Sequence, residues 1–293
     1  MNLALTVLEI VAPVFLLAGL GFGWVKAGFE YRIQFVTRLG MTLAVPCLIF
    51  TALMKSEVDL AEMGSLTLAT VAAYVAVGVV GAGLFQVLKL DQRTFLAPFI
   101  FGNTGNLGIP LALFAFGQPG LEYAVAILAV TSVMSFTLGI RLVAGSGAFL
   151  KILKEPIIAA SILGAVFLWQ GWQTPRFLTN TLDLIGQMAI PLMLLTLGVA
   201  VARLTPGRVG QAVWLSVLKL AICAAIAWVI GRLFGLDDIS FGVLVLQLST
   251  PVAVTAFLIA EKYGADSDSV AGLVVVSTVI SVAGLPLLLA LLI

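Results

Sequence analysis

The chain is a succession of apolar segments, each about 20 residues long, separated by short breaks that hold most of its charged residues. A helix of about 20 apolar residues spans the hydrocarbon core of a bilayer. Apolar residues make up 61% of the chain and charged residues 10%, against roughly 25% charged in soluble domains. We therefore expect an all-α integral membrane protein. The ten predicted transmembrane helices lie near residues 4–25, 33–54, 63–88, 94–117, 122–142, 152–170, 177–202, 209–234, 239–261 and 268–291.

The breaks between these segments exclude several classes of protein. None is long enough for a soluble domain, so an attached ATPase, receptor or periplasmic binding module is not expected. The chain has no histidine, and Cys47 and Cys223 lie far apart inside apolar segments without disulfide or metal spacing. No motif for phosphate binding, nucleophilic catalysis or nucleic-acid contact is present. We expect neither an enzyme nor a resident cofactor, and no nucleic-acid partner.

The basic residues predict the orientation in the membrane. The breaks after the odd-numbered segments hold 11 of the 15 Lys and Arg residues, and those after the even-numbered segments hold three. Basic residues gather on the cytoplasmic side of membrane proteins. We therefore expect a multi-pass protein of a bacterial-type inner (plasma) membrane with both termini outside. The first segment carries Glu9 and lacks a basic start, which indicates a helix and not a signal peptide.

The two halves of the sequence resemble each other. A shift of 146 residues lays 129–135 on 275–281, and the same shift lays 103–105 on 249–251. We interpret residues 1–146 as a first five-helix repeat and residues 147–293 as a second. Because five is odd, the second repeat is inverted relative to the first. This arrangement is typical of secondary transporters.

Two of the predicted helices are expected to be interrupted. Glycines, polar residues and a proline follow one another from Gly102 to Pro110, and residues 246–257 carry a similar polar run in the second half. Interrupted helices at corresponding positions indicate a transport site, where half-helix N-termini suit an anion. The alternative is proline kinks with small residues for tight helix crossing. The predicted substrate-binding residues are Asn103, Thr104, Gly105, Asn106, Pro110, Gln247, Ser249, Thr250, Pro251 and Lys219.

Lys219 lies near the middle of its segment, with no acidic residue within two turns. A charge at this depth is costly and by default indicates function. Its ammonium could neutralise a bound carboxylate or exchange a proton; alternatively, it packs against the carbonyl end of an interrupted helix. Glu9 and Asp183 lie toward the outer ends of their helices, where either could pair with Lys219, accept a coupling ion or face the interface.

Several of these runs together resemble the auxin efflux carrier family, which includes plant PIN carriers and bacterial malonate and other organic-acid permeases. The resemblance covers essentially the whole chain. It is carried by GNTGNLGIPLALFAFG at 102–117, AIPLMLLTLGVAVA at 189–202, PVAVTAFLIAEKYGAD at 251–266 and VVVSTVISVAGLPLLL at 274–289.

The resemblance implies a ten-helix inverted repeat related to the bile-acid/sodium symporter fold, with the fourth and ninth helices crossing at their breaks. The first, second, sixth and seventh helices would form a scaffold, and the rest a transport domain that moves as an elevator. Asn103 and Asn106 match the asparagine that contacts the substrate carboxylate in plant carriers. The acid and lysine of the plant third helix have no counterpart in 63–88, and Lys219 would take part of that role. The long plant loop is replaced by a short link at 143–151.

The expected function is secondary transport of small organic anions such as carboxylates. The coupling ion stays open between a proton and sodium, and the alternatives are a passive uniporter, an anion channel or a sodium-coupled carrier. Substrate identity and direction are not determined by these residues, and both a monomer and a homodimer remain compatible with them.

Overall fold

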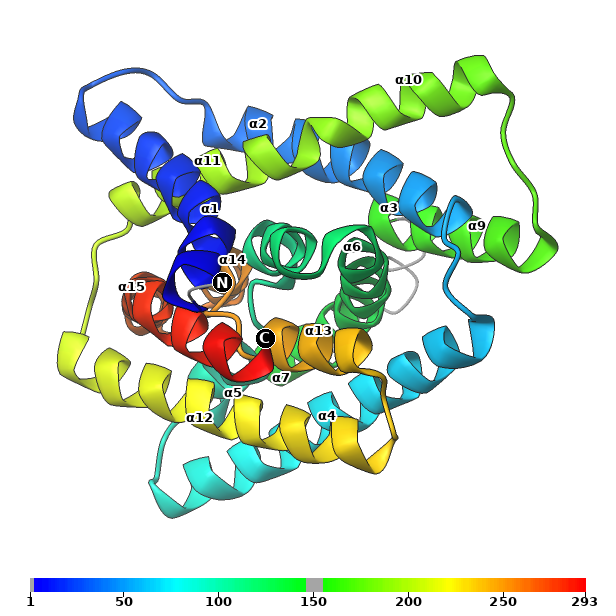
Figure 1. Cartoon of the computed structure of the whole chain (residues 1–293). Helices are drawn as coiled ribbons and strands as arrows, with labels where there is room; N and C mark the ends of the chain where they lie inside the picture. Colours follow the sequence, from blue (N-terminus) through cyan, green and yellow to red (C-terminus); the bar gives the residue numbers. More distant parts are fainter. Residues whose placement is uncertain (1–2, 146–154) are drawn as a thin grey trace.

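The computed structural model describes residues 3–145 and 155–293, and these residues form helices without a named strand (Figure 1). The start of the predicted helix 152–170 and most of the link 143–151 lie outside the described residues. The helices of the first half are α1 Leu3–Lys26, α2 Ile33–Leu39, η1 Gly40–Ala44, α3 Val45–Met54, α4 Leu60–Val87, α5 Gln92–Ile100, η2 Thr104–Gly108, α6 Ile109–Met134, η3 Ser135–Gly139 and α7 Ile140–Ala144. Those of the second half are α9 Pro156–Gln170, α10 Arg176–Gln187, α11 Ala189–Arg203, α12 Val209–Leu233, α13 Asp238–Leu248, α14 Val254–Tyr263 and α15 Ser267–Leu292.

Seven helical stretches among the described residues are long and apolar enough to cross a membrane. They are Leu3–Lys26, Ile33–Met54, Leu60–Val87, Thr104–Ala144, Arg176–Arg203, Val209–Leu233 and Ser267–Leu292. Pro156–Gln170 and Asp238–Leu248 are shorter apolar helices. The stretch Thr104–Ala144 bends at Gly117, whose φ of 66° and ψ of −152° are not helical, so it consists of two helices. The predicted class of all-α membrane protein is confirmed.

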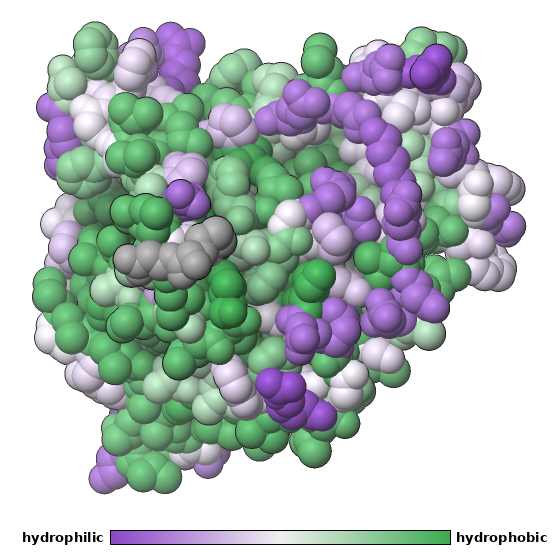
Figure 2. Space-filling model, in the orientation of Figure 1, coloured by the Kyte–Doolittle hydropathy of each residue, from purple (hydrophilic) through white to green (hydrophobic). Residues whose placement is uncertain are grey.

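Large apolar side chains are exposed along the outer helices, including Leu20 of α1, Val79 of α4 and Leu287 of α15. Figure 2 shows hydrophobic residues over much of the visible face, with most hydrophilic residues in its right half and smaller groups at the upper and left edges. In a membrane protein these exposed apolar side chains face lipid. The uneven distribution of hydrophilic residues therefore leaves a broad apolar surface for the bilayer.

Small residues allow two long helices to touch. A methyl group added at Gly198 of α11 would lie 1.7 Å from the Ala18 carbonyl oxygen of α1, and one added at Gly21 would lie 2.1 Å from that of Leu195. Close approach of backbones through small residues is typical of helix packing in membranes, where apolar burial gives little driving force. Figure 1 shows α1 and α11 side by side on the same side of the molecule as α2, α3 and α10.

Asp91 and Arg93, at the start of α5, fix the ends of three helices. Asp91 caps α5 by accepting hydrogen bonds from the backbone N–H groups of Arg93 and Thr94. The Arg93 guanidinium donates to the carbonyl oxygens of Val143 and Tyr263, near the C-terminal ends of α7 and α14. Cations near helix C-termini satisfy carbonyl groups that have no partner within the helix. Arg93 thus joins three helices that are far apart in sequence.

Both interrupted helices predicted from the sequence are present. Helix α5 ends at Ile100 and the chain becomes helical again at Thr104, whereas α13 ends at Leu248 and α14 begins at Val254. The two breaks, residues 101–103 and 249–253, are called the crossing below. They run antiparallel, with a bridge between Gly102 and Val252 and a hydrogen bond of 2.7 Å from the Asn103 N–H to the Pro251 carbonyl oxygen.

Candidate functional site

A cavity of about 290 Å³ lies at the crossing and is lined from both interrupted helices. Residues 103–106 line it from the first half of the chain, and residues 253–256 from the second. Its other walls come mainly from η1, α6 and η3 and the residues next to them. We call this space the crossing cavity.

Two helix N-termini open into the crossing cavity. The η2–α6 helix begins after Asn103 and α14 begins after Ala253, and no side chain caps either of them. The first N–H groups of a helix have no acceptor within that helix. Each N-terminus also carries a partial positive charge of about half a unit. The cavity therefore presents unused backbone donors and positive potential from two sides.

The amide and hydroxyl groups that line the cavity can donate hydrogen bonds to an anion. Asn103 is 5% exposed, and its Nδ2 has no hydrogen-bond partner among the described residues. Hydroxyl groups of Ser132, Ser135 and Thr255 also line the cavity. Glu155 is the one ionisable residue in the described lining. An anion in this cavity would be held by dipoles and hydrogen bonds.

The predicted substrate-binding residues fall into three groups. Residues 103–106 line the crossing cavity. Pro110 and Gln247 are buried and do not line it. Pro110 is in the first turn of α6, and the Gln247 amide packs against Gly108, where an added methyl group would lie 2.0 Å from Gln247 Oε1. Residues 249–251 line a separate cavity of about 10 Å³ together with Lys219.

The sequence did not single out residues 253–256, and the repeat offset explains why. The shift of 146 residues pairs Asn103 with Ser249. In the structure, the helices that follow the two breaks begin at Thr104 and at Val254, which are 150 residues apart. The difference of four residues is about one helical turn. An alignment of the two helix starts would have indicated Thr255.

Lys219 does not line the crossing cavity. It is 3% exposed, and its Nζ donates a 3.0 Å hydrogen bond to the Phe99 carbonyl oxygen in the last turn of α5. Lys219 therefore packs against the carbonyl end of an interrupted helix, which was the alternative expected from the sequence. Asp183 is not its partner, since its carboxylate pairs with Lys55.

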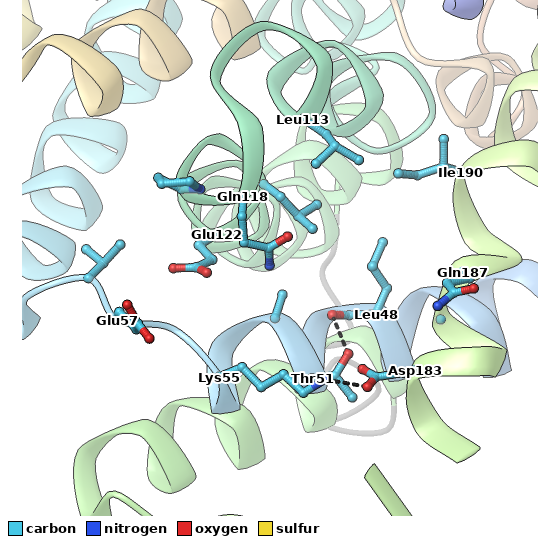
Figure 3. A pocket seen from close by; sticks show the side chains of 15 residues that line it. Leu48, Thr51, Lys55, Glu57, Leu113, Gln118, Glu122, Asp183, Gln187 and Ile190 are labelled. Atoms are coloured by element: carbon cyan, nitrogen blue, oxygen red, sulfur yellow. Dashed lines mark hydrogen bonds and ion pairs between the residues drawn. The ribbon is translucent and has the colours of Figure 1, made fainter. Parts of the chain in front are cut away.

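A second cavity, of about 900 Å³, lies around Lys55 and is called the Lys55 cavity (Figure 3). It is lined by the end of α3, the following link, the bend of α6, and α10. Lys55 forms its ion pair with Asp183 there, and the Ser56 hydroxyl donates a 2.6 Å hydrogen bond to Glu122. Gln118 and Glu122 come from the bend of α6 and face the end of α3 across the cavity (Figure 3).

A thin layer of residues separates the two cavities. On α3, Val45 lines the crossing cavity and Leu48 lines the Lys55 cavity. On α11, Met193 lines the crossing cavity, whereas Ile190 at the start of that helix lines the Lys55 cavity. Positions three apart on a helix are about one turn apart. The cavities thus approach each other from opposite ends of the same helices.

Comparison with known proteins gives matches along the whole chain. A sequence model of the family described as membrane transport protein matches residues 6–153 and 147–289. An uncharacterized transporter of Methanothermobacter thermautotrophicus is 29% identical, with 95% of this chain and 96% of the relative covered. A Rhizobium meliloti protein named "Putative malonate transporter" is 24% identical, with 90% of this chain and 85% of the relative covered.

Proposed function

Because the chain belongs to the membrane transport protein family, the auxin efflux carrier permeases, we propose that it is a secondary active transporter of small organic anions such as carboxylates. The observation that carries this proposal is the meeting of two uncapped helix N-termini in one cavity. The family and the relatives are transporters and not enzymes.

The chemistry of the crossing cavity favours a carboxylate. Backbone N–H groups at a helix N-terminus bind anions, and the helix dipole adds favourable potential. Asn103 Nδ2 supplies one more donor that is buried and unpaired among the described residues. A strongly bound anion with several charges would need a cation, and none lines the described part of the cavity. A compact monoanion or dianion fits this set of donors, and the malonate named for the Rhizobium relative is one such molecule.

The proposed architecture is a ten-helix, 5 + 5 inverted repeat. Ten transmembrane spans result when the interrupted helices are each counted as one span. The first is α5 with the helical residues before Gly117, and the second is α13 with α14. The antiparallel contact of Gly102 with Val252 at the crossing is what an inverted pair of interrupted helices would make. In this reading residues 1–146 and 147–293 are the two repeats.

The proposed mechanism is alternating access of the elevator type. The first, second, sixth and seventh transmembrane spans would form the scaffold, and the other six spans would carry the substrate past it. The two cavities support this, since about one helical turn separates their linings on α3 and on α11. A shift of the crossing by a turn or more would transfer a bound anion from one cavity to the other.

Transport could be coupled to protons, coupled to sodium or uncoupled, and imposed ion gradients distinguish the three. A passive uniporter or anion channel is the alternative function, since the same N-termini would attract anions in a pore. Counter-transport separates a carrier, coupled or passive, from a channel, because an unlabelled anion on the far side accelerates uptake by a carrier and has no such effect on a channel. Accumulation driven by an imposed sodium or proton gradient separates a coupled carrier from a passive uniporter.

The test is flux of radiolabelled malonate into liposomes that contain the purified protein, with Asn103→Ala beside the wild type. A hydrogen bond to a charged group contributes about 1.5–3 kcal/mol, so we expect malonate affinity to fall at least tenfold. Asn180→Ala changes an exposed asparagine of α10 and serves as the matched control. Imposed sodium, proton and potential gradients would identify the coupling ion. Unchanged affinity in folded Asn103→Ala protein would contradict the assigned site.

A further inference from the structure

Lys219 places a buried ammonium group against residues of the crossing that do not line the crossing cavity. Lys219 is 3% exposed, and its ammonium group contacts the Phe99 carbonyl oxygen at 3.0 Å and the Cys223 sulfur at 3.9 Å. An ammonium group has three donors, and sulfur is a weak acceptor. Two of the three donors therefore lack a strong partner among the described residues.

Unused oxygen acceptors lie beside these unused donors. The Ser216 and Ser249 hydroxyl groups are buried and have no hydrogen-bond partner among the described residues. Both serines line, with Lys219, a cavity of about 10 Å³ that also touches Thr250 and Pro251 of the crossing. A space of roughly this size is at the lower limit for one water molecule. Hydroxyl and carbonyl oxygens in such a group are the ligands that hard monovalent cations take.

The C-terminal ends of α5 and α13, the half-helices before the two breaks, add negative potential around Lys219. Phe99 lies in the last turn of α5, and Ser249 directly follows the last residue of α13. Helix C-termini carry a partial negative charge of about half a unit each. No acidic residue lines either small cavity that Lys219 touches in the described part of the chain. The positive charge of Lys219 thus offsets the partial negative charges of these two helix C-termini inside the membrane.

We propose that Lys219 is a positioning residue whose ammonium group fills a monovalent-cation position behind the crossing. By binding the Phe99 carbonyl it fixes the end of α5, and the chain reaches Gly102 and Asn103 only three and four residues later. It acts on the crossing cavity through this backbone and does not touch the anion. The inference goes beyond the proposed function and does not depend on the substrate.

One consequence separates this role from mere packing. When Lys219→Ala removes the side chain, the Phe99 carbonyl and the two serine hydroxyls remain around an enlarged cavity. A small cation such as sodium or ammonium should bind there and restore the lost charge. Lys219→Met leaves a neutral side chain of similar length in the cavity, so it should lose stability without gaining a cation site.

The experiment is thermal unfolding of the purified wild type, Lys219→Ala and Lys219→Met in sodium, ammonium or choline chloride at equal ionic strength. Ligand binding to the folded state raises the midpoint, by roughly 3 °C at ten times the dissociation constant. We expect this rise for Lys219→Ala in sodium or ammonium and not in choline, and no cation-specific rise for the other two. Lys55→Ala, which removes a more exposed lysine of an ion pair, is the control.

Two results would overturn the proposal. One is a folded Lys219→Ala protein with the same midpoint in all three salts. The other is a Lys219→Ala protein that cannot be recovered folded in any of them, because a filled cation position should restore the fold. Adding Ser249→Ala should weaken the cation response. These readouts need no transported substrate, so absence of malonate flux in the wild type would contradict the proposed function and leave this inference standing.

Discussion

At the scale of single residues, the crossing depends on the absence of a side chain at Gly102. A methyl group added there would lie 2.2 Å from Thr250 Oγ1 and 2.9 Å from the Thr250 carbonyl oxygen. The hydroxyl is itself held, since it donates a 2.7 Å hydrogen bond to the Gln247 carbonyl oxygen. The backbones of the two breaks can meet only because residue 102 is glycine.

Gly102→Ala should therefore damage both stability and transport. Overpacking of a close contact typically costs about 1–3 kcal/mol, and the shift would fall on the N-terminus that lines the crossing cavity. Thermal unfolding and malonate flux of the variant measure the two effects. Gly83→Ala on α4 is the matched control, because a methyl group there meets no atom within 4 Å. A Gly102→Ala protein with normal stability would contradict the contact.

At the scale of helices, aspartate side chains cap the starts of four helices. Asp59, Asp91, Asp237 and Asp266 accept hydrogen bonds from the first turns of α4, α5, α13 and α15. The two helix starts at the crossing, after Asn103 and Ala253, have no such cap. The helices α2, α9, α10 and α12 also begin without a side-chain cap. What distinguishes the two starts at the crossing is that they follow the interruptions and line one cavity.

The cap of α15 predicts a dependence of stability on pH. Hydrogen bonds from Ser269, and then the charge of Arg208, lower the pKa of Asp266 below its ordinary value. A carboxyl group with a lowered folded-state pKa stabilises the protein above its unfolded-state pKa. That contribution is lost as the pH falls through the folded-state pKa.

Asp266→Ala should thus cost about 1 kcal/mol near neutral pH, as loss of an N-cap usually does. The difference from wild type should shrink below the ordinary titration range of aspartate. Unfolding midpoints of both proteins across that pH range measure it. A difference that stays constant down to the most acidic condition would show that the carboxylate is not the stabilising form.

At the scale of the whole molecule, the two ends carry opposite charge. One end contains the Lys55–Asp183 pair and the hydrogen bond from Tyr123 to Glu62, and the other contains the contacts of Arg93 and Arg203. Apart from Glu9 and Lys219, which lie within the membrane-spanning helices α1 and α12, the described part of the first end has seven carboxylates and three basic side chains, and that of the second has six and nine. The acidic set is Glu57, Asp59, Glu62, Glu122, Asp183, Asp237 and Asp238. An anion therefore meets attraction at one end and repulsion at the other.

Charged cysteine reagents should detect this difference in potential. Gln187→Cys lies in the Lys55 cavity and Thr255→Cys in the crossing cavity, each made with Cys47→Ala. With each rate divided by that reagent's rate with a free thiol in solution, we expect the cationic trimethylammonium-ethyl methanethiosulfonate to react about tenfold faster than the anionic sulfonatoethyl reagent at position 187, and the preference to reverse at position 255. Glu57→Gln with Glu122→Gln should reduce the preference at position 187. Equal rates of the two reagents at both positions would contradict the charge difference.

The sequence alone determined the class of fold and the place of the interruptions. Runs of about 20 apolar residues require a bilayer, and the glycines, asparagines and proline from Gly102 to Pro110 cannot continue a regular helix. These properties are local, so they can be read along the chain. The expected resemblance to auxin efflux carriers is confirmed by the family match.

The tertiary structure decided which polar residues meet. Residues 103–106 and 253–256 share a cavity because the two breaks run antiparallel and the helices after them begin side by side, at Thr104 and Val254. These helix starts are 150 residues apart, about one turn away from the offset of 146 that sequence similarity favours. Lys219 lies behind the crossing because α12 and α5 both pack against α4 and α15, which brings the Phe99 carbonyl oxygen to its ammonium group. The pairing of the two breaks and the side on which Lys219 lies depend on contacts between distant segments. The hydropathy of the sequence contains no information about these contacts.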